Sequence, residues 1–79
     1  MPGEAKLTIT RGCVAASDGG VVEHGLGARP SVVYVVFTRR VRNEVVTVES
    51  VDRYRFVLAM KRADGSPAGP RMVSWSAWP

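Results

Sequence analysis

The stretch Tyr54-Arg55-Phe56-Val57-Leu58-Ala59-Met60-Lys61-Arg62 indicates the fold class of this 79-residue chain. As far as Met60, every second side chain is large and apolar, and the side chains between them are charged or smaller. Successive side chains of a β-strand point to opposite faces, so this alternation predicts a strand with one face in the core. The side chains expected in that core are those of Tyr54, Phe56, Leu58 and Met60.

Turn-forming residues bound this strand on both sides. The pair Asp52-Arg53 precedes it, and the Gly- and Pro-containing segment 63–70 follows it with the composition of a hairpin loop. Period-two patterns recur elsewhere, whereas no long segment shows the 3.6-residue apolar period of a surface helix. We expect strands at residues 5–10, 21–23, 31–38, 44–51, 54–62 and 71–78.

These strands predict an all-β fold, a small antiparallel β-sandwich or barrel of about five to seven short strands. The sequence leaves the choice between sandwich and barrel open, because strand order depends on contacts between distant segments. Residues 1–79 are expected to form a single β domain, with an N-terminal strand and arm over 1–20 and a core module over 21–79.

Two segments bear on what the domain exposes. Residues 31–38 (SVVYVVFT) are apolar on both faces, which predicts a strand covered on both sides at the centre of the domain. In the last strand Trp75 has the parity of Val73 and Ala77 and is expected in the core, whereas Trp78 has the opposite parity. Trp78 is therefore expected either against a partner or over the open end of its own sandwich.

The composition excludes several classes of protein. Hydrophobic residues make up 46% and charged residues 23%, which is typical of a globular chain, and the net charge of +4 is a moderate excess. No segment reaches the roughly 20 apolar residues of a membrane span, and the N-terminus lacks the apolar block of a secretory signal. Cys13, the single cysteine, can form no internal disulfide. Because no secretory signal or membrane span is present, we expect synthesis in a reducing cytoplasm. Because a chain of this length buries a thin core and has no disulfide, we also expect stabilisation by partner subunits.

The segment His24-Gly25-Leu26-Gly27-Ala28-Arg29-Pro30 contains the single histidine and is the first candidate for chemistry. A phosphate-binding loop would need more glycines at fixed spacings and a following helix, but a strand is expected here. We interpret the segment as a corner in which Gly25 adopts a positive φ, Gly27 does the same or allows a close backbone approach, and Pro30 fixes the entry into the next strand.

Other candidate catalytic groups lack the context that catalysis requires. Cys13 is in no recognisable cysteine-hydrolase motif and is expected to be a small buried or half-buried residue. Asp18, Asp52 and Asp64 all lie in turns, where an aspartate bonds its own backbone. One cysteine and one histidine are too few for a structural zinc site. We therefore expect the protein to have no catalytic residues, no cofactor and no metal. We do not expect it to be an enzyme.

The densest positive charge is Arg39-Arg40-Val41-Arg42. A nucleic-acid site would place such arginines beside exposed aromatic rings, whereas strand alternation sends Tyr54 and the neighbouring arginine to opposite faces. Nucleic-acid binding is therefore not expected, although a basic β-barrel that binds nucleic acid is kept as a third alternative. We expect these arginines to be solvated or to pair with acidic patches on a neighbouring subunit.

Three segments resemble a small β module of tailed-bacteriophage virion proteins. They are VVEHGLGARPSVVYVVF at 21–37, VESVDRYRFVLAM at 48–60 and DGSPAGPRMVSWSAW at 64–78. In that module a His-Gly-Leu-Gly corner and a proline lead into a valine-rich strand, and a Gly-Pro-containing hairpin leads into a final strand that ends in tryptophan. The resemblance covers roughly residues 20 to 79 and extends to decoration, head-fibre and tail-fibre proteins.

This resemblance implies a non-enzymatic virion protein, such as a capsid decoration, cement or head-tail connector protein. Its partners would be capsid or other virion proteins, usually within a homo-oligomer such as a trimer, and its location would be the virion after synthesis in the host cytoplasm. The alternative is a carbohydrate-binding module of a phage fibre, with Trp78 and Tyr34 as stacking platforms. The residues expected at an interface are Trp78, Arg39, Arg40, Arg42 and Tyr34.

Overall fold

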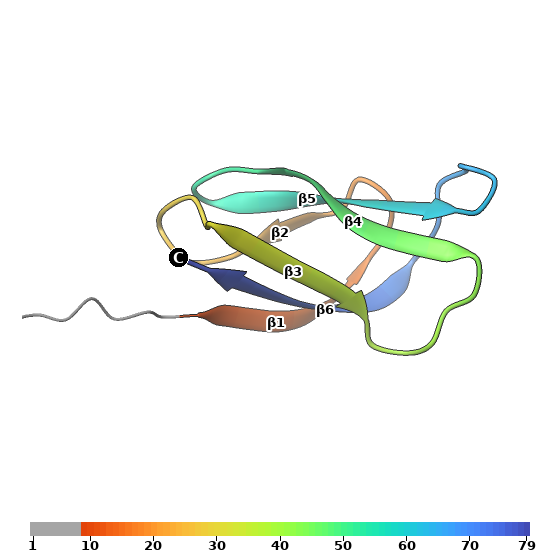
Figure 1. Cartoon of the computed structure of the whole chain (residues 1–79), viewed down its shortest axis with the longest axis horizontal. Coiled ribbons are helices and arrows are strands. Elements are labelled where there is room, and N and C mark those ends of the chain that lie inside the picture. Colours follow the sequence, from red (N-terminus) through yellow and green to blue (C-terminus); the bar gives the residue numbers. More distant parts are fainter. Residues whose placement is uncertain (1–8) are drawn as a thin grey trace, which may run out of the picture.

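The computed structural model describes residues 9–79, which form six antiparallel strands in two three-stranded sheets. The strands are β1 (Thr10–Ala16), β2 (Val21–Glu23), β3 (Val32–Phe37), β4 (Glu44–Val51), β5 (Arg55–Arg62) and β6 (Arg71–Trp78). One sheet has the order β1-β6-β3 and the other has the order β2-β5-β4. The two sheets lie one above the other (Figure 1), which confirms the all-β prediction and selects the sandwich.

Five of the six expected strands are present within a residue of the predicted bounds. The first expected strand does not match the first strand of the structure. Residues 5–8 of the expected strand at 5–10 lie outside the described residues, and the first strand runs instead from Thr10 to Ala16. This strand pairs with β6 over its whole length, from Thr10 opposite Ala77 to Ala16 opposite Arg71. The segment around Gly12 lacks an apolar alternation, and for this reason the sequence pattern did not indicate a strand there.

The core is formed mainly by the two central strands, β5 and β6. Phe56, Leu58 and Met60 of β5 and Val73 of β6 are fully buried. Trp75 packs against Phe56 edge to face, with ring centroids 5.5 Å apart, a geometry that the ring quadrupoles favour. Central strands bury most of their inward side chains because a strand flanks them on each side and the other sheet covers them, although Trp75 is only partly buried.

Tyr54 is not a core residue as expected, because 58% of its surface is exposed. β5 begins at Arg55, so Tyr54 belongs to the turn after β4 and does not take part in the alternation. In this turn Asp52 Oδ1 accepts hydrogen bonds from the backbone N–H groups of Tyr54 and Arg55 at 2.7 and 2.8 Å. The turn geometry, rather than the apolar character of the ring, determines where Tyr54 points.

The expectation that residues 31–38 form a central strand covered on both faces is also wrong. β3 is at an edge of the β1-β6-β3 sheet and pairs only with β6. Its inward residues Val33, Val35 and Phe37 pack against the core, whereas Val32, Tyr34 and Val36 are exposed on the other face. Both faces of β3 are apolar as predicted, but no element of the described chain covers the face that points away from the core.

Polar contacts join the two sheets at the end that contains the β3–β4 and β5–β6 loops. Arg71 of β6 donates two hydrogen bonds to Glu44 of β4, from Nε at 3.0 Å and from Nη2 at 2.8 Å. Close backbone packing occurs here as well, because a Cβ atom on Gly69 would lie 2.7 Å from Ser17 Cα. Among residues 9–79 there is no helix that is long and apolar enough to cross a membrane.

Candidate functional site

His24 is a structural residue of the corner between β2 and β3. Its side chain is 1% exposed, and the Leu26 N–H donates to Nδ1 at 3.1 Å. Since Nδ1 accepts, Nε2 carries the proton and donates to the Asp52 carbonyl oxygen at 2.9 Å. Both ring nitrogens are therefore occupied by backbone partners, and the imidazole has no free nitrogen with which to act as a base.

The glycines of the corner have the backbone conformations that a corner needs. Gly25 and Gly27 have φ angles of 74° and 76°, which L side chains rarely adopt. The His24 N–H donates to the Tyr54 carbonyl oxygen at 3.1 Å, which attaches the corner to the β4–β5 turn. The positive φ angles predicted for this segment are confirmed, and the glycines together with His24 direct the chain from one sheet to the other.

The turn aspartates divide into two kinds. Hydrogen bonds from the Tyr54 and Arg55 N–H groups hold the pKa of Asp52 below its usual value of 3.8. Hydrogen bonds from the Ser66 hydroxyl and N–H lower the pKa of Asp64 in the same way. These two carboxylates bond their own turns as expected, so they are occupied by local structure.

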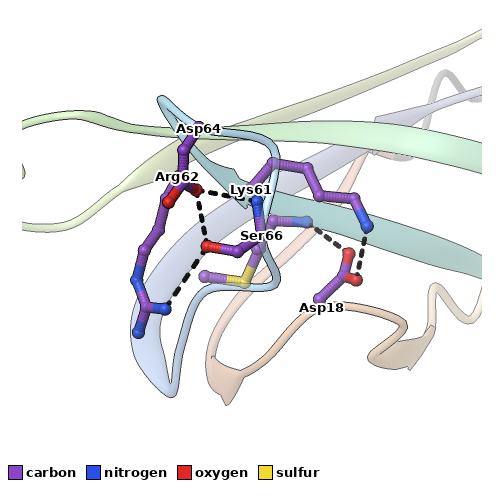
Figure 2. Close-up of polar contacts among 6 residues, drawn as sticks. Asp18, Lys61, Arg62, Asp64 and Ser66 are labelled. Carbon is purple, nitrogen blue, oxygen red and sulfur yellow. Dashed lines mark hydrogen bonds and ion pairs between the residues drawn. The ribbon is translucent and has the colours of Figure 1, made fainter.

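Asp18 does not bond its own turn, contrary to the expectation. It accepts hydrogen bonds from Lys61 Nζ at 2.7 Å and from the Met60 N–H at 2.9 Å, which lower its pKa (Figure 2). Asp18 therefore joins the β1–β2 turn to β5. The hydrogen bonds from Arg71 lower the pKa of Glu44 as well. All four carboxylates accept hydrogen bonds that stabilise the sandwich.

Cys13 is exposed, which corrects the expectation of a buried or half-buried thiol. It lies on the outward side of β1, and its Sγ is 3.3 Å from the Ser74 hydroxyl of the neighbouring strand. Alternation places it outward because Gly12 and Val14 point inward. Among residues 9–79 no group of three or more His, Cys, Asp or Glu side chains is placed to hold a metal ion.

Exposed apolar side chains gather on the outward side of the β1-β6-β3 sheet, which we call the outer face. Strand pairing places on it Arg11, Cys13, Ala15, Met72, Ser74, Ser76, Trp78, Val32, Tyr34 and Val36. Five of these are large apolar residues with 43% to 63% of their surface exposed: Val32, Tyr34, Val36, Met72 and Trp78. Exposed apolar side chains that gather on one face indicate a binding surface more strongly than scattered ones do.

A groove runs along the middle of the outer face. Its volume is about 380 Å³, and it is lined by Ser74 and Ser76 of β6, with Tyr34 and Val36 of β3 on one side and Arg11 of β1 on the other. The small serines leave the central strand lower than the flanking side chains. Tyr34, the most exposed of the large apolar residues at 63%, therefore forms a wall of this groove.

A second hollow lies where the β3–β4 loop meets the start of β6. It has a volume of about 240 Å³, and Arg39, Arg40, Val41, Pro70 and Met72 contribute to its lining. Arg39 and Arg40 are exposed. Met72 belongs both to this hollow and to the outer face, so the two surfaces are continuous.

Charge is distributed unevenly over the described residues. The side-chain carboxylates of residues 9–79 are Asp18, Glu23, Glu44, Glu49, Asp52 and Asp64, and none of them is on the outer face. They lie on the strands of the other sheet or in turns. The outer face therefore carries one charged side chain, that of Arg11, and has an arginine-rich loop at one end.

The structure divides the five expected interface residues between the outer face and the β3–β4 loop, and Arg42 lines a different hollow from Arg39 and Arg40. Tyr34 and Trp78 are on the outer face, with Trp78 opposite Val32 and Tyr34 opposite Ser76. The arginines Arg39, Arg40 and Arg42 lie in the β3–β4 loop, at the end opposite the C-terminus (Figure 1). Sequence reasoning did not identify Val32, Val36 and Met72, although the parity they share with Tyr34 and Trp78 could have indicated them.

Comparison of the chain with models of known protein families, with curated proteins and with solved structures finds no match.

Proposed function

We propose that this protein is a non-enzymatic structural protein of a tailed-bacteriophage virion that binds a neighbouring virion protein through the outer face. The observation that carries the proposal is the concentration of exposed Val32, Tyr34, Val36, Met72 and Trp78 on a face without a carboxylate. Binding is favoured there because apolar area can be removed from water without burying a side-chain carboxylate. The resemblance of three segments to phage modules supplies the virion context.

The size of the surface fits a partner that also uses flanking contacts. The exposed parts of its large apolar residues together amount to roughly 500 Å², within the range of the largest patch on a typical monomer. A standard interface buries about 800 Å² on each partner. A partner seated on the outer face would therefore be expected to reach the β3–β4 loop or the groove as well.

Co-sedimentation with purified particles of the encoding phage tests this proposal, with heads and tails assayed separately. Tyr34→Ser and Trp78→Ser should each reduce the bound fraction strongly, because exposed aromatic residues are frequent binding anchors. Tyr54→Ser is the matched control, since Tyr54 is 58% exposed and lies away from the outer face. If the wild-type protein fails to bind either fraction, or if all three variants bind equally, the proposal is wrong.

The groove favours a second candidate, a carbohydrate-binding module. Tyr34 stands beside the serine hydroxyls and the Arg11 guanidinium, so an aromatic stacking surface and hydrogen-bonding groups share one concavity. Trp78, the other expected platform, is outside the groove lining. A specific glycan-array signal that Tyr34→Ser abolishes and Trp78→Ser retains would favour this candidate over protein binding.

A further inference from the structure

Arg39 and Arg40 differ from the cations that stabilise the sandwich. Lys61 pairs with Asp18 and Arg71 pairs with Glu44, at 2.7 and 2.8 Å. Within residues 9–79, no hydrogen bond or ion pair joins the side chain of Arg39 or Arg40 to another residue. These two exposed guanidinium groups therefore remain free to bind an external acid.

Apolar atoms adjoin the two guanidinium groups. Met72 is 51% exposed, and Val41 and Pro70 help to line the same hollow. The Thr38 N–H and hydroxyl both donate to the Met72 carbonyl oxygen, at 3.2 and 3.3 Å, which fixes the start of the loop against β6. The hollow thus combines two free cations with a small apolar surface on a fixed support.

This combination fits one kind of ligand better than its alternatives. Guanidinium groups bind carboxylates through paired hydrogen bonds, and the apolar atoms can cover an aliphatic side chain next to such carboxylates. Single-stranded nucleic acid is disfavoured because its bases stack on aromatic rings, and no aromatic residue lines this hollow.

A second copy of the chain is also disfavoured. Asp18, Glu44, Asp52 and Asp64 already accept hydrogen bonds within their own sandwich. The two remaining described carboxylates, Glu23 and Glu49, lie on β2 and β4, which are separated by β5. The described part of the chain therefore presents no cluster of free carboxylates with which another copy could fill the hollow.

We propose that the hollow lined by Arg39, Arg40 and Met72 binds a segment of a partner protein in which carboxylates adjoin an aliphatic side chain. This inference rests on the proposed function, because it states the chemistry that the partner presents at the edge of the outer face. Attraction between opposite charges orients the partner at this edge, while the exposed apolar residues of the outer face supply contact area.

Fluorescence anisotropy with a labelled acidic peptide that contains leucine tests the inference directly. The comparison probes are a basic peptide of the same length and a single-stranded DNA oligonucleotide. The Arg39→Glu/Arg40→Glu variant is compared with Arg29→Glu/Arg53→Glu, which reverses the same number of exposed arginines in the β2–β3 loop and the β4–β5 turn. The two variants have the same net charge, so any difference between them reports position.

We expect the acidic peptide to bind the wild-type protein with an affinity that falls as salt rises. Arg39→Glu/Arg40→Glu should weaken this binding by about tenfold or more, and the control pair by less than about threefold. Equal losses in the two variants, no binding of the acidic peptide, or tighter arginine-dependent binding of the DNA would each overturn the inference.

Co-sedimentation with particles separates this inference from the proposed function. If Tyr34→Ser abolishes particle binding and Arg39→Glu/Arg40→Glu does not, the outer face binds the partner and the acidic contact is refuted. If the wild-type protein binds no particle fraction while the peptide result holds, the proposed function fails and the acid-binding hollow stands. Loss of particle binding in both variants supports both proposals.

Discussion

Replacing His24 tests whether the HGLG corner is held by its imidazole. His24→Ala removes the acceptor of the Leu26 N–H and the donor to the Asp52 carbonyl oxygen, contacts of 3.1 and 2.9 Å. The substitution also leaves a cavity at the position of the His24 side chain, which is only 1% exposed. The β2–β3 corner would then be attached to the β4–β5 turn by the backbone bond from the His24 N–H to Tyr54 alone.

The expected loss follows from these two bonds. Each hydrogen bond contributes about 1 kcal/mol net, and a buried group left without a partner costs roughly 1 to 3 kcal/mol. Because water can reach part of this corner, we expect a loss of about 3 kcal/mol in the free energy of unfolding. A domain of this length has a total stability of about 4 to 12 kcal/mol. The melting temperature should fall by about 12 to 24 °C.

Thermal and urea unfolding followed by circular dichroism measure this loss, with two further variants as controls. His24→Asn can keep the acceptor near Nδ1 and His24→Gln can keep the donor near Nε2, so each should fall between the wild type and His24→Ala. Tyr54→Ala, at an exposed neighbouring site, should cost less than about 1 kcal/mol. A His24→Ala loss below about 1 kcal/mol would refute the structural role of the imidazole.

Three further predictions concern the same sandwich. Gly69→Ala should destabilise it by about 3 kcal/mol, because φ is +112° and the new Cβ would lie 2.7 Å from Ser17 Cα; Gly65→Ala, with open space around it, should cost about 1 kcal/mol in the same urea assay. Leu58→Ala should cost about 3 to 4 kcal/mol by leaving a cavity in the core, and a loss below 2 kcal/mol by chemical denaturation would contradict the assigned burial. The four carboxylates Asp18, Glu44, Asp52 and Asp64 have lowered pKa values when folded, so the unfolded chain binds more protons in acid; their contribution to the urea midpoint should be fully present above pH 4.5 and be lost as the pH drops below their ordinary values of 3.8 and 4.5, and a midpoint that rises there would contradict the contacts.

Alternation was a good guide where one face is apolar and the other is not. It predicted the inward side chains of β5 and β6, including Phe56 and Trp75, and the outward direction of Trp78. It could not orient β3, because a strand that is apolar on both faces has no alternation to show which face is covered. The edge position of β3 follows from its pairing with β6, a segment more than 30 residues away in the chain.

The missed features depend on contacts between distant segments. β1 lacks an apolar pattern partly because Gly12 faces Trp75, where a Cβ would come within 3.1 Å of the indole nitrogen. Asp18 bonds the Met60 N–H at a separation of 42 residues, and no turn rule predicts such a partner. The outer face was predicted only as single residues, since its continuity requires β6 to lie between β1 and β3.

The central place of β6 also determines the order in which the chain can fold during synthesis. β1 and β3 have no hydrogen-bonded strand in their sheet other than β6, which is the last of the six strands to be synthesised. While residues 71–78 are still inside the ribosome, the β4–β5 hairpin can form, but the valine-rich β3 remains unpaired. Nascent chains stalled before Arg71 should therefore be sensitive to proteases and prone to aggregation, and release of the final strand should complete the sandwich.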